Sequence, residues 1–200
     1  MLKLNDLAKN YIGVNEGTTE HHNIIDTYNT INPLPRGYAV SYDDSWCMVF
    51  VSVMAKLDNI NNFPFECSVP NVYNQFLTNG LITFKPKAGD LIFYSWGRGN
   101  GSSPDHIGII DKVDNNLITT IEGNYSDSVK QRTININDDC ILGFGDMSYY
   151  YNNVNYDDMT IHELAIKTIR GDFGVGADRV NALGDKYNAV QKEVNKILNS

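Results

Sequence analysis

Cys47 is the residue of this sequence whose position is most suggestive of chemistry. Three residues of types that cap helix starts precede it in a polar turn: Asp43, Asp44 and Ser45. Apolar residues follow it at steps of three and four, as on one face of a helix: Val49, Phe50, Val53, Met54 and Leu57. The first turn of a helix offers unpaired N–H groups and a dipole that favour a thiolate. Cys47 is therefore a candidate nucleophile, although a cysteine considered alone is more often an inert core residue.

A cysteine nucleophile needs a base, and the base needs a group that orients it. Of the four histidines, His106 alone stands at the start of a predicted sheet strand, after the glycine-rich loop 97–103. Glu122 and Asn124 occupy alternate positions of the strand that returns beyond a predicted hairpin, so we expect them on one face. A backbone-satisfied histidine and an exposed strand end remain the alternatives for each residue singly. The joint pattern favours a catalytic group.

The elements that must position these residues change character along the chain. Helices are expected first, at residues 2–12, 47–59 and 69–77. Strands follow at residues 90–94, 106–113, 117–124, 132–136 and 140–144, with a hairpin turn at 114–116. This order predicts an α+β fold with an antiparallel sheet. His21 and His22 lie in the polar region 16–41 and are interpreted as solvated loop or helix-start histidines, because no further ligand stands at a supporting spacing.

Composition excludes several classes of function. The net charge of −8 over 200 residues offers no basic face for nucleic acid. No apolar run approaches the ~20 residues that span a bilayer, so no membrane partner is expected. The first residues lack the apolar segment of a signal peptide, which predicts synthesis in the cytoplasm. The three cysteines at 47, 67 and 140 are odd in number and form no Cys-x-x-Cys pair, so neither a disulfide framework nor a zinc site is indicated.

Four segments together resemble a CHAP domain, the cysteine, histidine-dependent amidohydrolase/peptidase family. They are residues 44–52, 87–93, 104–110 and 120–124, in that order, and the resemblance spans residues 4–146. Residues 13–17 and 24–29 are similar to the N-terminal stretch of CHAP domains in phage lysins of Gram-positive hosts. The resemblance implies a papain-like NlpC/P60 fold, in which N-terminal helices pack on the antiparallel sheet.

The same resemblance implies roles. Cys47 would be the nucleophile and His106 the general base, while Glu122 would orient the imidazole and Asn124 would help to fix it or the substrate. The implied reaction is cleavage of peptidoglycan amides, with the backbone N–H of Cys47 donating to the oxyanion. The glutamine that papain-like enzymes often carry upstream of the cysteine is not matched here. The acidic calcium loop of some CHAP enzymes is not matched either, so no structural metal is expected, and no cofactor is called for.

Four further residues are candidates for contact with the substrate: Tyr42, Trp46, Trp96 and Asp105. Trp46 stands beside the nucleophile, and a core aromatic is the alternative interpretation. Trp96 flanks the glycine-rich loop together with Tyr94, and strand packing is the alternative for both. Cys67 and Cys140 belong to no motif and are interpreted as structural.

The C-terminal part of the chain predicts a separate unit. Residues 148–157 have no hydrophobic period and are interpreted as a linker, which divides the chain into a CHAP domain at 1–147 and a tail at 158–200. Helices are expected at 159–170, 178–183 and 187–198. This tail resembles the CW_7 cell-wall-binding repeat, which implies an all-α three-helix bundle. Its predicted core residues are Leu164, Ile169, Leu183, Val190, Val194 and Ile197.

The repeat implies binding to the muropeptide of peptidoglycan. Asp172, Phe173 and Arg179 are the predicted contacts, with Phe173 standing where a tryptophan is usual; helix capping and a surface salt bridge are the alternatives. A single repeat provides no avidity within one chain. We therefore expect either a homo-oligomer or association with a shorter C-terminal product started at Met147 or Met159.

Together these features predict a phage-type endolysin that acts on the wall of a Gram-positive host after holin-type release. The alternatives are a bacterial autolysin with the same chemistry and a non-catalytic wall-binding or virion protein.

Overall fold

The computed structural model describes residues 4–60, 62–97, 103–152 and 159–199. Within these ranges the chain forms two compact units, one from α1 to α5 with the whole sheet and one from α6 to α8. The first unit contains α1 (Leu4–Ala8), α2 (Thr19–Asn29), α3 (Cys47–Leu57), α4 (Val69–Thr78) and α5 (Ser148–Asn152). Short 3₁₀ turns η1 (Lys9–Tyr11) and η2 (Pro35–Gly37) accompany them.

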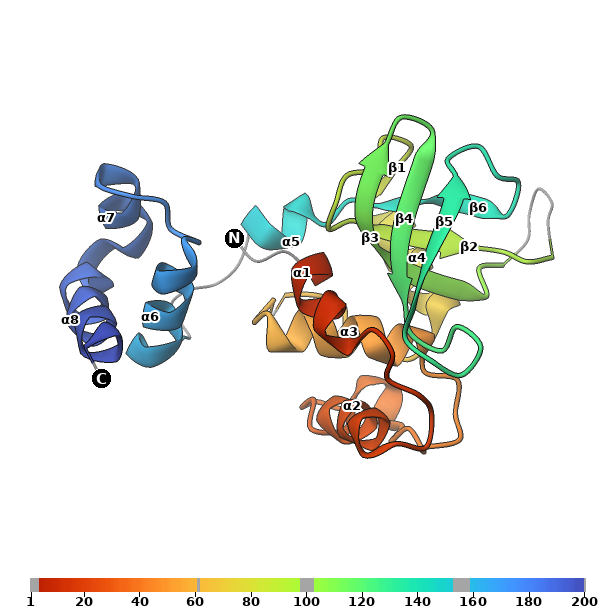
Figure 1. The fold of residues 1–200 in the computed structure, drawn as a ribbon, viewed down its shortest axis with the longest axis horizontal. Coiled ribbons are helices and arrows are strands. Elements are labelled where there is room, and N and C mark those ends of the chain that lie inside the picture. Colours follow the sequence, from red (N-terminus) through yellow and green to blue (C-terminus); the bar gives the residue numbers. More distant parts are fainter. Residues whose placement is uncertain (1–3, 61, 98–102, 153–158, 200) are drawn as a thin grey trace. The chain divides into compact units, whose positions relative to one another are not determined.

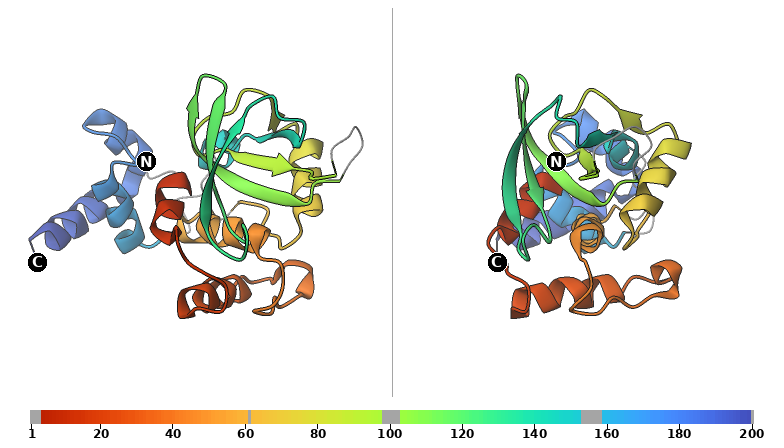
Figure 2. Two further views of the ribbon diagram at one scale, coloured as in Figure 1. Left: turned by 45° about the vertical axis from the view of Figure 1, so that its right-hand side comes forward. Right: turned by 90° about the vertical axis from the view of Figure 1, so that its right-hand side faces the viewer.

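The central element of the first unit is α3. All residues from Cys47 to Ala55 are buried, which is the pattern of a helix that is covered on every side. It contacts α2 on one side and β3 on the other, and α1 also packs against it (Figures 1 and 2). The catalytic candidate therefore sits at the first residue of the best-buried helix.

Six antiparallel strands form one sheet in the order β1-β6-β2-β3-β4-β5 (Figure 1). Their bounds are β1 (Ile82–Thr83), β2 (Leu91–Tyr94), β3 (His106–Asp114), β4 (Leu117–Glu122), β5 (Lys130–Asn135) and β6 (Ile141–Gly145). One face packs in the main core with α3, through residues that include Phe93, Ile109 and Ile121. The other face carries a smaller apolar cluster that includes Tyr94 and Ile110. The predicted α+β architecture with an antiparallel sheet is confirmed.

Two predictions for this unit are wrong. The region 16–41 contains α2, whose buried residues His21, Ile24, Ile25 and Tyr28 have helical spacing. His21 and His22 lie in the first turn of α2, as their helix-start interpretation predicted, but His21 is not solvated: its side chain is fully buried, and its Nδ1 accepts a hydrogen bond from Gly17 N at 3.2 Å. The strand predicted to reach residue 124 ends at Glu122, and Asn124 lies in the following turn with a left-handed φ of 57°.

The prediction of a linker is also wrong for its first half, because residues 148–152 form the helix α5. Tyr150 is 3% exposed and packs its ring 5.6 Å from that of Phe63. The hydroxyl of Tyr151 accepts a hydrogen bond from the backbone N–H of Leu4 at 2.9 Å. Aromatic side chains thus tie this segment to the first unit although they show no helical period. Residues 153–157 of the predicted linker lie outside the described residues.

The second unit is helical, as predicted, and consists of α6 (Ile161–Arg170), α7 (Ala177–Leu183), the turn η4 (Gly184–Lys186) and α8 (Tyr187–Leu198). Thr160 and Glu163 form a capping box at the start of α6, and Gly171 ends the helix with a left-handed φ of 91°. The core comprises Met159, Leu164, Ala165, Phe173, Leu183, Val190 and Val194. Ile169 was predicted in this core but is 40% exposed, because the buried face of α6 passes through Thr168, one helical step away.

Candidate active site

Cys47 is the first residue of α3 and is 7% exposed. The hydrogen bond from Phe50 N to Trp46 O, 2.9 Å long, closes the first helical turn, so the N–H of Cys47 precedes the bonded ladder. The capping predicted for the preceding turn is wrong. The N-cap residue is Trp46, whose indole has no oxygen to accept a bond, and Asp44 instead accepts from Ser41 N at 2.8 Å.

His106 is the first residue of β3 and pairs with Tyr94 of β2. Its Nε2 lies 2.9 Å from Oε2 of Glu122, and the side chain of Cys47 is near enough to the ring to raise the pKa of the imidazole. Because Glu122 occupies Nε2, Nδ1 is the ring nitrogen left for the sulfur. Burial disfavours the imidazolium, but the hydrogen bonds and charges of Cys47 and Glu122 outweigh it and raise the pKa of His106 to about 9. The imidazole is therefore protonated at neutral pH.

Glu122 is the last residue of β4, and its side chain is fully buried. Its Oε1 accepts hydrogen bonds from the hydroxyls of Tyr94 at 2.8 Å and Thr120 at 2.6 Å. Arg132 of β5 donates from Nε to Oε1 at 2.9 Å and from Nη2 to Oε2 at 3.0 Å. Burial raises the pKa of this carboxyl, but the bonds from His106 and Arg132 outweigh it and lower the pKa to about 2. Glu122 is therefore ionised wherever the protein is folded near neutral pH.

The sequence prediction did not assign Thr120 and Arg132 to the site, and it named Tyr94 only as a neighbour of the glycine-rich loop or a packed strand residue; Tyr94 is fully buried and bonds to Glu122. Thr120 shares a strand face with Glu122 at a spacing of two, a signal that was available in the sequence. Arg132 lies opposite Thr120 in the register of β4 and β5, and Tyr94 lies opposite His106 in that of β2 and β3. Those registers join segments distant along the chain, so neither partner could be found by local spacing.

Two glycines let the site assemble. A Cβ at Gly123 would lie 2.5 Å from Cβ of Phe50 and 3.1 Å from the ring of Trp46, so α3 packs directly on the turn that follows Glu122. A Cβ at Gly108 would lie 2.7 Å from Cγ of Glu122. The side chain of Glu122 therefore passes over Gly108 on its way to His106.

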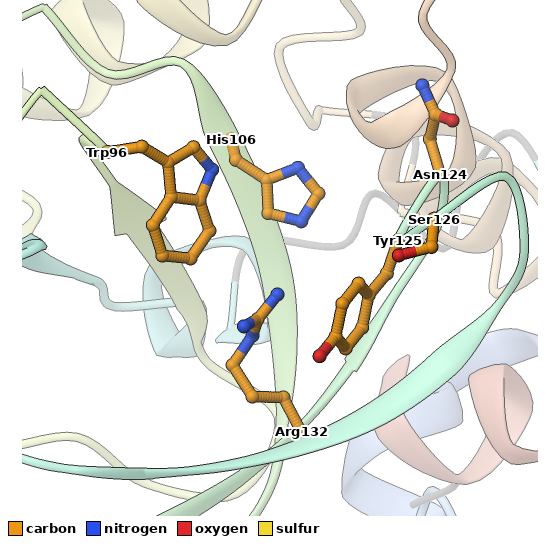
Figure 3. Close-up of a pocket in the computed structure, with 6 residues that line it drawn as sticks. All are labelled: Trp96, His106, Asn124, Tyr125, Ser126 and Arg132. Atoms are coloured by element: carbon orange, nitrogen blue, oxygen red, sulfur yellow. The ribbon is translucent and has the colours of Figure 1, made fainter.

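A pocket of about 320 Å³ opens beside the imidazole. Its lining residues are Trp96, His106, Asn124, Tyr125, Ser126 and Arg132 (Figure 3). Trp96 is 43% exposed and stacks on Tyr94 with ring centroids 5.0 Å apart. Asp105 accepts hydrogen bonds from the backbone N–H of Trp96 at 3.1 and 3.2 Å, so it supports the position of that residue. Of the two predicted substrate contacts, Trp96 lines the pocket, whereas Asp105 is not among the lining residues and reaches the site only through the backbone of Trp96.

Asn124 reaches the same pocket from the turn after β4, and its amide points away from the imidazole (Figure 3). Its contact with substrate stays a prediction. Trp46, in contrast, is fully buried, and its Nε1 donates to Oε2 of Glu16 at 2.9 Å, so of its two interpretations the core aromatic is confirmed and the substrate contact is wrong. Tyr42 is 41% exposed, but it stacks on His22 and donates to Asp26 at 3.0 Å, away from the pocket-lining set.

The predicted wall contacts lie in the second unit. Phe173 is 4% exposed within the core, so its predicted role as a ligand contact is wrong. Asp172 lies 3.4 Å from Nζ of Lys167, with its side chain 3% exposed. Arg179 is more accessible and donates to the carbonyl of Gly174 at 3.0 and 3.1 Å. A separate pocket of about 330 Å³ is lined by residues that include Leu183 and Lys186.

Within the described residues, no group of three or more His, Cys, Asp or Glu side chains is arranged to hold a metal ion. No helix in the same ranges combines the length and the apolar character of a bilayer span.

Comparison with known proteins identifies two families. Residues 37–124 match the CHAP domain and residues 162–198 match the CW_7 repeat.

The crystal structure of Ly7917 is similar at 14% identity over 64% of this chain and 62% of that chain, with a TM-score of 0.39. The crystal structure of Ly7917 with the hydrolyzing product of MDP gives 13% identity, 62% and 61% coverage, and a TM-score of 0.38. The chain thus spans less than two thirds of the length of Ly7917. No curated protein matches the sequence significantly. The two family matches, in the order and at the places that the motifs predicted, show that this chain carries a CHAP domain followed by a CW_7 repeat.

Proposed function

We propose that this protein is a peptidoglycan hydrolase that cuts an amide of the wall peptide by means of Cys47 and His106. The observation that supports it most directly is the 2.9 Å hydrogen bond between Nε2 of His106 and the buried carboxylate of Glu122, on a ring whose pKa the neighbouring Cys47 also raises. A family of amidohydrolases and peptidases and a cell-wall repeat in one chain agree with that chemistry and with that substrate.

In the first half of the proposed reaction, the imidazolium of His106 favours the thiolate form of its neighbour Cys47. The thiolate attacks the amide carbonyl carbon, a C–S bond forms, and the negative charge moves to the oxygen. The N–H of Cys47, ahead of the helical ladder, would donate to that oxygen. The C–N bond then breaks, and the nitrogen leaves as an amine with the proton of His106 Nδ1.

In the second half, the neutral His106 accepts a proton from water as the water attacks the thioester. The C–S bond breaks, a carboxylic acid product leaves, and the thiolate–imidazolium pair is restored. Glu122 stays ionised throughout, because its pKa is lowered to about 2, and it keeps Nε2 protonated and the ring oriented. We assign the pocket beside His106 to the peptide, with Trp96 and Tyr125 as walls and Asn124 as a polar contact.

The CW_7 repeat would hold the enzyme on the wall, with Arg179 the most accessible of the predicted contacts. Within this proposal the protein acts as a phage endolysin, synthesised in the cytoplasm of a Gram-positive host and released to the wall through a holin. A homo-oligomer, or association with a shorter product started at Met147 or Met159, would supply further repeats. Mass measurement in solution tests this part: only full-length monomer would contradict it.

The test of the central claim is loss of turbidity of Gram-positive cell walls. We expect wild type and Cys47→Ser to differ by several orders of magnitude, because serine beside an imidazolium is a weak nucleophile. Cys67→Ser is the matched control, since Cys67 is also a free thiol, partly exposed and outside the site. Unchanged lysis by Cys47→Ser would end the thiol mechanism. Wall binding without lysis by the wild type would favour the non-catalytic alternative.

Mass spectrometry of the digested walls identifies the bond. Free lactyl groups on the glycan would indicate an N-acetylmuramoyl-L-alanine amidase, and new amino termini within the peptide would indicate an endopeptidase.

A further inference from the structure

Arg132 makes the most extensive contacts with Glu122 of any cation in the described residues. It binds the carboxylate through three hydrogen bonds, from Nε to both oxygens at 2.9 and 3.1 Å and from Nη2 to Oε2 at 3.0 Å. The planar fork of a guanidinium suits this two-oxygen geometry, and a lysine ammonium does not reproduce it. Because both carboxylate oxygens accept hydrogen bonds from Arg132, the orientation of the carboxylate plane is fixed as well as its position.

Aromatic rings hold Arg132 in turn. Its guanidinium carbon lies 4.0 Å from the ring centroid of Tyr125 and 4.9 Å from that of Trp96. Figure 3 shows the guanidinium below the imidazole of His106, with Tyr125 on one side and Trp96 on the other. These cation–π contacts restrict the rotamers of a long side chain that would otherwise be mobile.

The carboxylate needs such a partner. Glu122 is fully buried, and a buried charge is costly unless it is paired and hydrogen-bonded. The hydroxyls of Tyr94 and Thr120 both bond to Oε1, so the oxygen that faces His106 depends on Arg132 for its second bond. Without the guanidinium, Oε2 would be held by the imidazole alone.

We propose that Arg132 is a positioning residue, which acts through Glu122 to orient His106 toward Cys47 and to set the charge balance of the pair. The inference rests on the proposed thiol chemistry at Cys47. The groups that face Glu122 are His106 from β3, Tyr94 from β2, Thr120 from β4 and Arg132 from β5, and Cys47 adjoins beyond His106. Loss of one positive charge from this set makes the thiolate harder to form and the imidazolium harder to deprotonate.

The experiment measures alkylation of Cys47 in the full chain by iodoacetamide as a function of pH, followed by mass spectrometry of the Cys47 peptide. This rate reads the thiolate–imidazolium pair directly and requires no wall substrate. The profile has an acid limb, where the thiolate of Cys47 forms, and an alkaline limb, where the imidazolium of His106 loses its proton. For Arg132→Met we expect both limbs to move to higher pH by about one unit. For Arg132→Lys, which keeps the charge but loses the fork, we expect unmoved limbs and a plateau rate reduced about tenfold.

Lys130→Met is the matched control. Lys130 lies two residues earlier on β5 and also faces the ring of Tyr125, at 5.7 Å, but it donates to the carbonyl of Ser126 and not to Glu122. Its loss removes one cation of the same strand, and we expect an unchanged profile. Thermal unfolding identifies any variant that fails to fold, in which case Arg132→Lys alone decides the question through its plateau rate.

Hydrolysis of Gram-positive cell walls gives the second measurement. We expect both Arg132 variants to lose turnover about tenfold or more while the apparent KM changes less than about threefold. Unmoved limbs in Arg132→Met, or a full plateau rate in Arg132→Lys, would overturn the proposal. A raised KM at unchanged turnover would overturn it too, since Arg132 would then hold substrate. If wild type alkylates as expected but cuts no wall, the proposed function fails and the positioning role stands.

Discussion

Gly108→Ala should disable the site by steric displacement of Glu122 alone. The added methyl carbon would lie 2.7 Å from Cγ of Glu122 and 3.5 Å from its Cδ. Gly108 is the third residue of β3, where its backbone is held by pairing with Ile92. The strand therefore cannot withdraw easily, and the glutamate must move.

The size of the movement follows from van der Waals contact. Carbon atoms pack at about 3.5 Å or more, so Cγ of Glu122 has to shift by about 1 Å. The carboxylate is tied to His106, Arg132, Thr120 and Tyr94, and a displacement of this size breaks or lengthens at least one of those bonds. A misplacement of about 1 Å at a reacting group costs roughly 100-fold in rate. Overpacking of this kind also lowers the free energy of unfolding by about 1–3 kcal/mol.

The assay compares initial rates of wall lysis and of Cys47 alkylation for Gly108→Ala and wild type. Gly145→Ala is the control, because a Cβ there would lie 2.8 Å from the ring of Phe76, in the core and away from the site. We expect both variants to lose stability, and only Gly108→Ala to lose about 100-fold in lysis. The alkaline limb of the alkylation profile should also move to lower pH, because a displaced Glu122 supports the imidazolium less well.

A folded Gly108→Ala with lysis and alkylation within a few-fold of wild type would refute this reasoning. Glu122 would then have to reach His106 by another path, and the close approach at Gly108 would carry no functional meaning. Equal losses in Gly108→Ala and Gly145→Ala would show that core strain, and not the placement of Glu122, limits the rate.

Further expectations concern charge, pH and the second unit. Glu122→Gln removes the charge that supports the imidazolium, so the pKa of His106 should fall from about 9 toward its ordinary 6.5. The alkaline limb of Cys47 alkylation should then move to lower pH, and an unmoved limb would contradict the pairing of His106 with Glu122. The pKa of His106 is raised on folding, so its contribution to stability is full below pH 6.5 and is lost as the pH rises through about 9. The pKa of Glu122 is lowered from 4.5 to about 2, so its contribution is present above pH 4.5 and is lost as the pH falls toward 2. Urea unfolding of wild type and His106→Asn should therefore differ most near pH 6 and converge at alkaline pH, and a constant difference would contradict the shift. Leu164→Ala empties a fully buried site in the small second unit and should cost about 2–5 kcal/mol. Wall adsorption should be lost in that variant while Cys47 alkylation stays at the wild-type rate, and adsorption that survives would show that the repeat is not the tether.

Local patterns were sufficient for several features. The apolar spacing after Cys47 predicted a helix that does begin at that residue, and the hairpin at 114–116 predicted that His106 and Glu122 meet. Both depend on interactions over a few residues, which backbone preference and periodicity express directly. The helices of the second unit were predicted nearly to their bounds for the same reason.

Tertiary structure decided which side chains are buried and which strands pair. The sequence left open whether Trp46 lies in the core, and it favoured solvent for His21 and ligand contact for Phe173, yet each of the three is enclosed by the elements packed around it. Arg132 became part of the site through the register of β4 and β5, and Gly108 through the path of a glutamate on the neighbouring strand. Burial and register are properties of contacts between distant segments, so no local pattern in the sequence contains them. The sequence thus determined which three residues we propose as nucleophile, base and orienting carboxylate, while only packing decided what holds that carboxylate in place.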